Sequence, residues 1–223
     1  TKLWKNLMKN EFFKRILSSI ILLPIVIFFI IKGSFLFNSL ILICSIITLY
    51  EWQLMSKGKN YNIFGFIYII ASFYIIYLLR NYSDDKYLFF LLILIICIST
   101  DIGGYVFGKV FKGPKLTKIS PNKTYAGMIG AFLLSIFTAT FFLNYYDYYL
   151  IDRFEILNIY NFIFIIFISF VSQFGDILIS FFKRRSKIKN SGKIIPGHGG
   201  LLDRIDGMIF AFPASYLIFK IIN

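Results

Sequence analysis

Long runs of apolar residues dominate this sequence and limit what it can fold into. Of its 223 residues, 58% are hydrophobic and 16% are charged, whereas a soluble domain has about 25% charged residues. A helix that crosses a membrane needs about 20 consecutive apolar residues. Runs of about that length lie near 16–32, 34–54, 61–80, 86–108, 124–146, 158–182 and 203–222. The sequence therefore predicts an all-α polytopic membrane protein with about seven transmembrane helices.

We expect these runs to form one integral membrane domain over residues 1–223, with N-terminal helices in 1–97 and, in 98–223, the helices and cytoplasmic loops that carry the polar residues discussed below. No small-residue cleavage site follows the first run, so we expect a retained helix rather than a signal peptide. The first two runs are separated by Gly33 and its neighbours and should form a tight hairpin. Cys44 and Cys97 both lie in apolar runs, so neither a disulfide nor a cysteine metal site is expected.

Basic residues are concentrated in alternate connections between the predicted spans. Most of the 24 Lys and Arg residues fall in the N-terminal arm and in 55–60, 109–123 and 183–204. The positive-inside rule places these segments and the N-terminus in the cytoplasm, and the C-terminus outside. This topology and anionic lipid headgroups explain the net charge of +13, so no nucleic-acid partner is expected. Both long basic loops then open onto the compartment that holds nucleoside triphosphates.

Several carboxylates occur where a membrane makes charge costly. An intramembrane carboxylate costs about 3 kcal/mol or more and is by default a sign of function. For Asp101, pairing with a cation only to fix helix packing is an equally good interpretation. For Asp176, Asp203 and Asp206, the spacing relative to other polar residues favours a functional site.

One helix face carries a carboxylate, a hydroxyl and two cations at i, i+4, i+7 and i+8, namely Asp176, Ser180, Lys183 and Arg184. These intervals bring side chains together on an α-helix. Asp203 and Asp206 follow at the start of the last predicted span, with Arg204 between them. A plain helix-start role is available for these acids. A divalent-metal and phosphate site accounts better for the whole group, because Mg²⁺ is held by one or two carboxylates plus substrate phosphates.

Glycines surround the only histidine of the chain in the segment between those helices, which reads Pro196, Gly197, His198, Gly199 and Gly200. Glycines allow backbone N–H groups to approach an anion closely, although an ordinary turn before a helix would use them too. His198 either stabilises a leaving pyrophosphate or shapes this loop.

The earlier basic loop has a similar character. Gly104 and Gly108 form a small-xxx-small pair that favours close helix packing. Thr124 is expected to cap the helix that follows it. For Lys123, contact with a phosphate and a purely topological role are equally plausible.

These residues together resemble the signature of the phosphatidate cytidylyltransferase (CDP-diacylglycerol synthase) family. The resemblance covers roughly residues 98–210, and the N-terminal helices match only in being hydrophobic. The residues that carry it are Asp101-Ile102-Gly103, Ser120-Pro121, Lys123-Thr124, Gly175-Asp176, Ser180, Lys183-Arg184, Lys189, Gly192, Pro196 to Gly200, Asp203-Arg204 and Asp206.

The resemblance implies a Mg²⁺-dependent transfer of the cytidylyl group of CTP to phosphatidic acid, giving CDP-diacylglycerol and pyrophosphate for phospholipid biosynthesis. It implies that Asp176 and Asp203 hold the metal, with Asp206 as a further ligand and room for a second cation such as K⁺. The expected catalytic residues are Asp176, Asp203, Lys183 and His198. The expected substrate-binding residues are Lys123, Ser180, Arg184, Gly199, Gly200 and Arg204. The expected location is the bacterial inner membrane, with the active site facing the cytoplasm, and a homodimer is left open.

Three positions depart from the pattern, because Ala126, Ile179 and Asn190 stand where the family usually has carboxylates. A catalytically inactive relative is therefore one alternative. A cation-coupled transporter is another, because transporters also place carboxylates within the membrane. Its carboxylates would lie at the midplane, however, whereas those of this chain lie near one face, beside basic loops.

Overall fold

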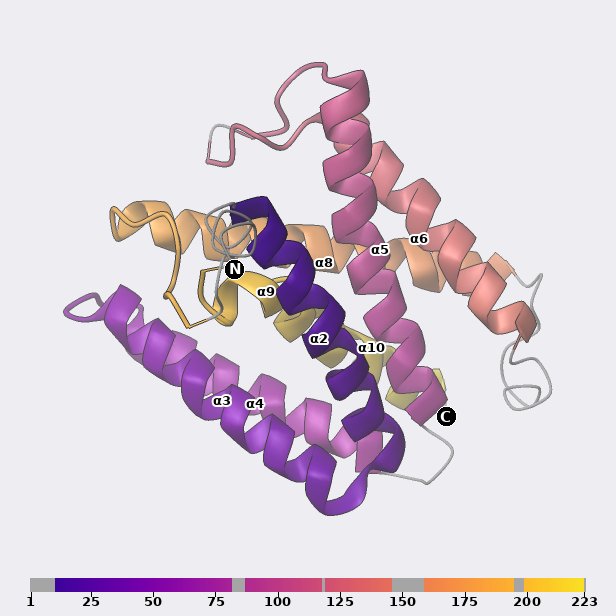
Figure 1. Ribbon diagram of the computed structural model, residues 1–223, viewed down its shortest axis with the longest axis horizontal. Helices are drawn as coiled ribbons and strands as arrows, with labels where there is room; N and C mark the ends of the chain where they lie inside the picture. Colours follow the sequence, from indigo (N-terminus) through magenta and orange to yellow (C-terminus); the bar gives the residue numbers. More distant parts are fainter. Residues whose placement is uncertain (1–10, 82–86, 118, 146–158, 195–198, 223) are drawn as a thin grey trace, which may run out of the picture.

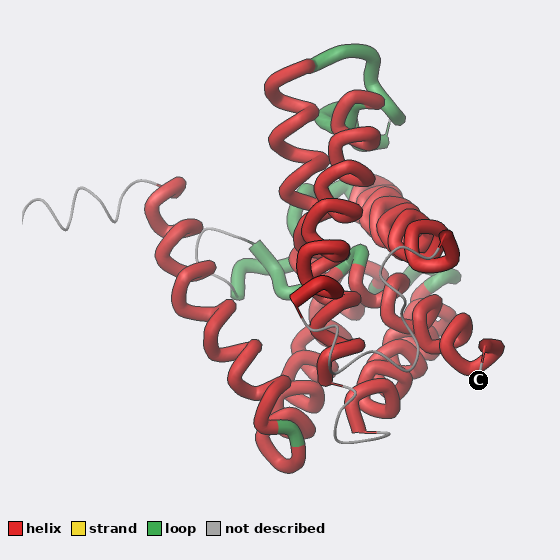
Figure 2. The backbone as a smooth tube through the Cα atoms, turned by 90° about the vertical axis from the view of Figure 1, so that its right-hand side faces the viewer, coloured by secondary structure: helices red, strands yellow, loops and turns green. Residues whose placement is uncertain are grey.

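The computed structural model describes the chain outside residues 1–10, 82–86, 118, 146–158, 195–198 and 223. The described residues are mainly helical and contain no strand (Figures 1 and 2). The helices are α2 (Glu11–Lys32), α3 (Ser34–Ser56), α4 (Asn62–Asn81), α5 (Tyr87–Phe111), α6 (Tyr125–Tyr145), α8 (Ile159–Arg185), α9 (Leu202–Ile205) and α10 (Met208–Ile222). The predicted all-α polytopic class is confirmed.

Five of these helices, α3 to α6 and α8, are long and apolar enough to cross a membrane. The first and last predicted spans fall on α2 and α10, whose described apolar parts, Leu22–Lys32 and Met208–Ile221, are shorter. The α8 helix runs to Arg185, beyond the predicted end at 182, so its last turn is basic. Cations suit this position because the carbonyl end of a helix is electronegative.

The last predicted span, 203–222, is corrected by the structure. It is divided into the short α9 and the longer α10. At the division, the Asp206 carboxylate accepts a hydrogen bond from the N–H of Gly207 at 2.9 Å. Gly207 packs so closely on Ser172 of α8 that a Cβ there would overlap the serine hydroxyl. Local side-chain bonding and close approach to α8 thus interrupt the helix, which an apolar count does not reveal.

The helices cross one another rather than lying parallel. The α5–α6 hairpin crosses α8, while α3 and α4 pair with each other and α10 packs against α4, α5 and α8 (Figure 1). The N-terminal half of α5 lies in the core, where Leu92, Ile93 and Ile96 are almost fully buried. The α2 helix stands away from the rest except near its C-terminal end (Figure 2).

Glycines let α5 and α6 approach each other closely, as predicted. Gly108 of α5 faces Gly127 of α6, and Gly104 lies near the same residue. The closest approach is at Gly103, where a Cβ would lie 2.5 Å from the carbonyl oxygen of Gly130. This packing holds the cytoplasmic half of α5 against the start of α6, and both contribute to the cavity described below.

The predicted tight hairpin between α2 and α3 is also present. Gly33 connects the two helices with a φ of 62°, a conformation that glycine adopts readily. The buried Arg80 of α4 donates hydrogen bonds to the carbonyls of Ile30 at 2.7 Å and Ile31 at 3.2 Å. These bonds satisfy carbonyls that the end of α2 would otherwise leave without partners.

Candidate active site

A cavity of about 400 Å³ lies between α5, α6, α8 and the segment that leads into α9. This volume is within the usual range for small-molecule sites. Its polar lining comes from four separate parts of the chain, and comprises Thr100, Asp101, Tyr105, Ser120, Asn122, Lys123, Thr124, Gln173, Asp176, Lys183, Asn190, Asp203, Arg204 and Asp206. The structure therefore brings most of the predicted charged residues to one place.

The predicted polar face of α8 is present, and its residues have distinct surroundings. Ser180 donates a hydrogen bond to the Asp176 carboxylate at 3.3 Å. Asp176 and Lys183 line the cavity. Arg184 instead donates to the carbonyl of Ile188 at 3.0 Å and is exposed. This arginine bonds to the backbone just after the C-terminal end of α8. Its predicted substrate contact remains a prediction.

Lys123 connects the basic loop between α5 and α6 to α8. Its ammonium lies 2.5 Å from the Asp176 carboxylate. The loop around it is held by backbone hydrogen bonds, in which Leu116 donates to the carbonyl of Lys123 and Tyr125 donates to that of Pro114. Lys123 is therefore placed in the cavity, which favours ligand contact over a purely topological role.

Thr124 caps α6, as predicted. Its hydroxyl oxygen accepts the N–H of Gly127 at 3.1 Å, and the helix begins at the next residue, Tyr125. This is the N-cap arrangement that satisfies an otherwise free N–H in the first turn. The cap also fixes the point at which the chain leaves the loop, immediately after Lys123.

Asp203 uses both carboxylate oxygens. One lies 2.9 Å from the ammonium of Lys183. The other accepts the N–H groups of Ser191 at 2.9 Å and Gly200 at 3.1 Å. The bond to Gly200 ties this carboxylate, in the first turn of α9, to the residue just before the N-cap, Leu201. Asp203 thus combines the helix-start role with a link between the glycine-rich segment and α8.

Lys183 also lies between Asp203 and a second carboxylate. Its ammonium is 3.7 Å from that of Asp206, and both Lys183 and Asp206 are 7% exposed. Two buried carboxylates create a negative potential that a cation must offset, because unpaired buried charges are costly. In the structure the Lys183 ammonium is that cation. The predicted i, i+3 pair therefore converges on Lys183.

Asp101 faces the same cavity from α5. Among the described residues, no Lys or Arg lies within ion-pair distance of it. Its role therefore stays a prediction. Arg204 lines the cavity from α9 and is exposed.

The glycine-rich segment only partly follows the prediction. His198 lies outside the described residues, so its role stays a prediction. Gly199 has a φ of 92°, which favours glycine, and a Cβ there would lie 2.8 Å from the Asp203 carboxylate. Gly200 is buried against Ser191 and Glu51, and its N–H is used by Asp203. Glycine was expected here to let a ligand approach the backbone, but at Gly200 the closely packed groups are side chains of the protein, Ser191 and Glu51.

Glu51 is the residue that sequence reasoning missed. It lies on α3, is 1% exposed, and accepts hydrogen bonds from the N–H groups of Leu201 at 2.9 Å and Leu202 at 2.8 Å. It also accepts the hydroxyl of Ser191 at 2.8 Å. The signal was available, because Glu51 is a carboxylate within the predicted span 34–54, like those selected for attention later in the chain.

The cavity offers oxygen ligands for a cation without forming a complete cage. Among the described residues, no three His, Cys, Asp or Glu side chains come together in a way that could hold a metal ion. Mg²⁺ needs only one or two carboxylates when substrate phosphates complete its coordination. Asp176, Asp203 and Asp206 line one cavity and each contacts a lysine ammonium. The donor chemistry therefore fits Mg²⁺ shared with a phosphate ligand.

Two of the three departures from the family pattern lie in different cavities, and position accounts for only one of them. Ile179 is 3% exposed and lines a separate apolar cavity of about 230 Å³ beside Trp52 and Phe182. Asn190 lines the main cavity and supplies a polar amide there. A carboxylate at 179 would not belong to the charged cavity, so its absence removes no group from it.

Comparison with known proteins places the sequence among lipid nucleotidyltransferases. A sequence profile of the cytidylyltransferase family matches residues 60–222. The phosphatidate cytidylyltransferase of Rickettsia bellii (strain RML369-C) is 36% identical over 219 residues, covering 96% of this chain and 93% of that protein. That of Rickettsia typhi (strain ATCC VR-144 / Wilmington) is 35% identical, with coverages of 93% and 92%. That of Bacillus subtilis (strain 168) is 34% identical over 158 residues, covering 70% and 56%.

The similarity is wider than the expected range of 98–210, because the rickettsial relatives align with nearly the whole chain, N-terminal helices included. The extent of the profile match, the level of identity and the charged cavity agree with one another, and the chain belongs to the cytidylyltransferase family.

Proposed function

We propose that this protein transfers the cytidylyl group of CTP to phosphatidic acid, forming CDP-diacylglycerol and pyrophosphate at the cytoplasmic face of a bacterial inner membrane. One observation carries the proposal. The carboxylates and cations of the family signature converge on a single cavity between membrane helices, within the residues that match the family. The relatives that are phosphatidate cytidylyltransferases support this choice of substrates.

The reaction is a substitution at phosphorus. A phosphate oxygen of the lipid attacks the α-phosphorus of CTP, the bond from that phosphorus to the bridging oxygen of the β-phosphate breaks, and pyrophosphate leaves. No strong general base is required, because a phosphate monoester is already anionic near neutral pH. Catalysis of such reactions rests mainly on positioning and electrostatic stabilisation.

Cations of the cavity offset the repulsion between two anionic substrates. Lys123, Lys183 and Arg204 reach it from the α5–α6 loop, α8 and α9 respectively. Because they come from separate elements, they can contact phosphates from different sides. Lys183 is already held by Asp203 and Asp206, so its ammonium needs little reordering to act.

Mg²⁺ would be held by Asp176 and Asp203, with Asp206 as a further ligand and K⁺ as a candidate second cation. When bound, the metal neutralises and orients phosphate oxygens. One Asp203 oxygen accepts the N–H groups of Ser191 and Gly200, which hold this carboxylate in place beside Lys183.

The lipid would reach the cavity sideways, with its acyl chains remaining in the bilayer. The cavity is bordered by α5, α6 and α8, which are long and apolar enough to span a membrane. The polar headgroup can therefore enter between helices while the chains stay among apolar side chains.

The direct test supplies purified protein in detergent with labelled CTP, phosphatidic acid and Mg²⁺, and measures labelled lipid. We expect labelled CDP-diacylglycerol, and loss of its formation when Mg²⁺ is chelated. Folded protein that forms no labelled lipid would support the inactive-relative alternative. Substrate-dependent ion flux in proteoliposomes would instead support the transporter.

Asp176→Asn tests the metal and phosphate assignment. We expect this variant to remain folded and to lose at least about 100-fold in turnover, because it lacks the carboxylate that would hold Mg²⁺ and that pairs with Lys123. Asp84→Asn, which lies in the sequence between α4 and α5 and outside the family signature, is the control and should keep wild-type turnover. Wild-type activity of Asp176→Asn would contradict the assignment.

A further inference from the structure

Glu51 is a buried carboxylate that the chemistry proposed above does not use. It is on α3, far in sequence from the signature, yet its described partners all lie after α8, at Ser191 and at the start of α9. Two are backbone N–H groups at the start of α9 and one is the hydroxyl of Ser191. An anion bound by N–H groups at a helix start is well stabilised. Here the anion belongs to the protein.

Ser191 joins Glu51 to Asp203. Its hydroxyl donates to Glu51 at 2.8 Å and its N–H donates to Asp203 at 2.9 Å. The same short segment is thus held by one carboxylate from α3 and by another that also contacts Lys183 of α8. Movement of the segment away from Glu51 would displace Asp203 and its neighbour Arg204, both of which line the cavity.

Two signature glycines fit closely around Glu51. A Cβ at Gly192 or at Gly200 would overlap the Glu51 carboxylate. Gly192 has no positive φ, so its backbone conformation does not require glycine. The space occupied by Glu51 gives a physical reason for glycine at both positions.

We propose that Glu51 is a positioning residue for the nucleotidyl transfer, which holds Ser191 and the start of α9 at Leu201 and Leu202 so that Asp203 and Arg204 face the substrates. This inference rests on the proposed function. It assigns a catalytic contribution to an N-terminal helix that precedes the residues matched by the family profile.

The test compares Glu51→Gln with Thr48→Val. The amide keeps the size of Glu51 but places an NH₂ group among three donors. We expect kcat/KM for CTP to fall about 10- to 100-fold, the range for buried donors left without an acceptor, mainly through a higher KM for CTP. Thr48 lies one turn earlier on α3 and is fully buried, and its hydroxyl bonds only to the carbonyl of Cys44. Thr48→Val should therefore keep wild-type kinetics.

A second measurement does not depend on activity. Limited trypsin digestion at Lys189 and Lys193 reports release of the segment, and both residues are exposed. We expect faster cleavage in Glu51→Gln than in wild type, and no change in Thr48→Val. Ser191→Ala removes one bond to Glu51 and should lower kcat/KM about 3- to 10-fold, which decides the question if Glu51→Gln does not fold.

The fit of Gly192 supplies an independent check. Introduced into the wild-type protein, Gly192→Ala should speed trypsin cleavage. Introduced into Glu51→Ala, it should have little further effect on the cleavage rate, because the overlapping carboxylate is gone. Wild-type kinetics and cleavage rates for Glu51→Gln, or wild-type behaviour of Ser191→Ala, would overturn the inference. Absence of turnover in the wild-type protein would instead contradict the proposed function, and the digestion results would still test Glu51.

Discussion

At the scale of single residues, Lys183 is the residue that links two of the carboxylates of the cavity. It is 7% exposed, and its ammonium is shared by Asp203 and Asp206. A buried charge that loses its partner is more costly than the pair was favourable, because the desolvation cost remains while the attraction is lost. The two carboxylates therefore depend on Lys183 for stability as well as for activity.

Lys183→Met should accordingly lower the free energy of unfolding by about 3–5 kcal/mol and abolish CTP turnover. Thermal unfolding in detergent and the labelled-lipid assay measure the two effects. Arg185→Met is the matched control, since Arg185 is an exposed cation two residues further along, lying over the ring of Tyr61. It should retain both properties. A Lys183→Met variant with wild-type turnover would exclude the arrangement proposed for the cavity.

Asp101 differs from these carboxylates, because no cation lies within ion-pair distance of it among the described residues. An intramembrane carboxylate without an ion-pair partner is by default a sign of function rather than of packing. Asp101→Asn should reduce turnover while leaving the thermal midpoint unchanged or higher. A lower midpoint with unchanged turnover would show that Asp101 serves packing alone.

At the scale of helices, the α5–α6 hairpin depends on close backbone contact. Gly103 and Gly104 are neighbours on α5 but differ in the space around them. A Cβ at Gly103 would lie 2.5 Å from the Gly130 carbonyl oxygen, whereas at Gly104 the nearest atom is 3.9 Å away. Only the first substitution forces the helices apart, and this shift would move Asp101 relative to Lys123.

Gly103→Ala should therefore destabilise the protein by about 1–3 kcal/mol, the usual cost of overpacking, and reduce turnover. Gly104→Ala should leave the thermal midpoint within experimental error of wild type. Thermal unfolding of both variants in the same detergent gives the comparison. Equal midpoints for the two would mean that the hairpin accommodates the extra methyl group by another route.

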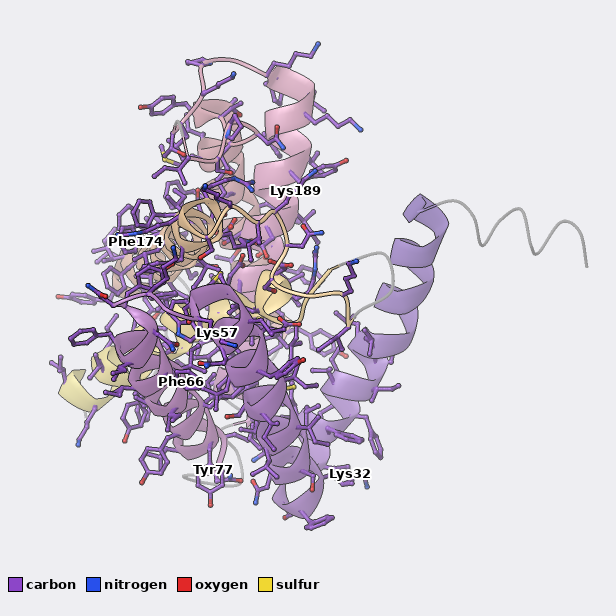
Figure 3. The ribbon with its side chains drawn as sticks, turned by 90° about the vertical axis from the view of Figure 1, so that its left-hand side faces the viewer. Lys32, Lys57, Phe66, Tyr77, Phe174 and Lys189 are labelled. Atoms are coloured by element: carbon purple, nitrogen blue, oxygen red, sulfur yellow. The ribbon has the colours of Figure 1, made fainter. Side chains whose placement is uncertain are left out.

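At the scale of the whole molecule, the ends of the helices divide into two groups. Figure 3 shows Lys32 and Tyr77 at one end and Lys189 toward the other. The basic connections after α5 and α8 line the cavity, and that after α3 bonds to the end of α8 through Tyr61 and Ser186, whereas the α2–α3 hairpin and the end of α4 do not line it. The proposed topology therefore places the cavity in the cytoplasmic half.

Cysteine labelling tests this topology in a background with Cys44 and Cys97 replaced by Ala. Lys57→Cys and Lys112→Cys should react with a membrane-impermeant maleimide only after cells are permeabilised. Asn81→Cys should react in intact cells. The reverse pattern would place the cavity on the outer face and remove access to cytoplasmic CTP.

Much of the site follows from local sequence, as particular residues show. The spacing of Asp176, Ser180 and Lys183 predicts a shared helix face from helical periodicity alone. Thr124, a threonine just before a predicted span, is likewise predicted to be an N-cap. Gly200 shows the limit of prediction from local sequence. A glycine-rich segment predicts that another group packs closely on its backbone, but it does not identify that group, which here is Ser191 and Glu51. Ile179 shows it again, since a missing carboxylate matters only if its position faces the cavity.

The sequence by itself determined the helical membrane class and most of the helix bounds, because these depend on run length and periodicity, and its charge distribution predicts the cytoplasmic side for the basic loops. The tertiary structure alone decided that Lys123 contacts Asp176 and that Lys183 lies between Asp203 and Asp206. It also decided that Glu51 accepts hydrogen bonds at the start of α9. The physical reason is that these contacts depend on which helices cross and at what point. Side-chain packing over the whole molecule settles that, and no local pattern encodes it.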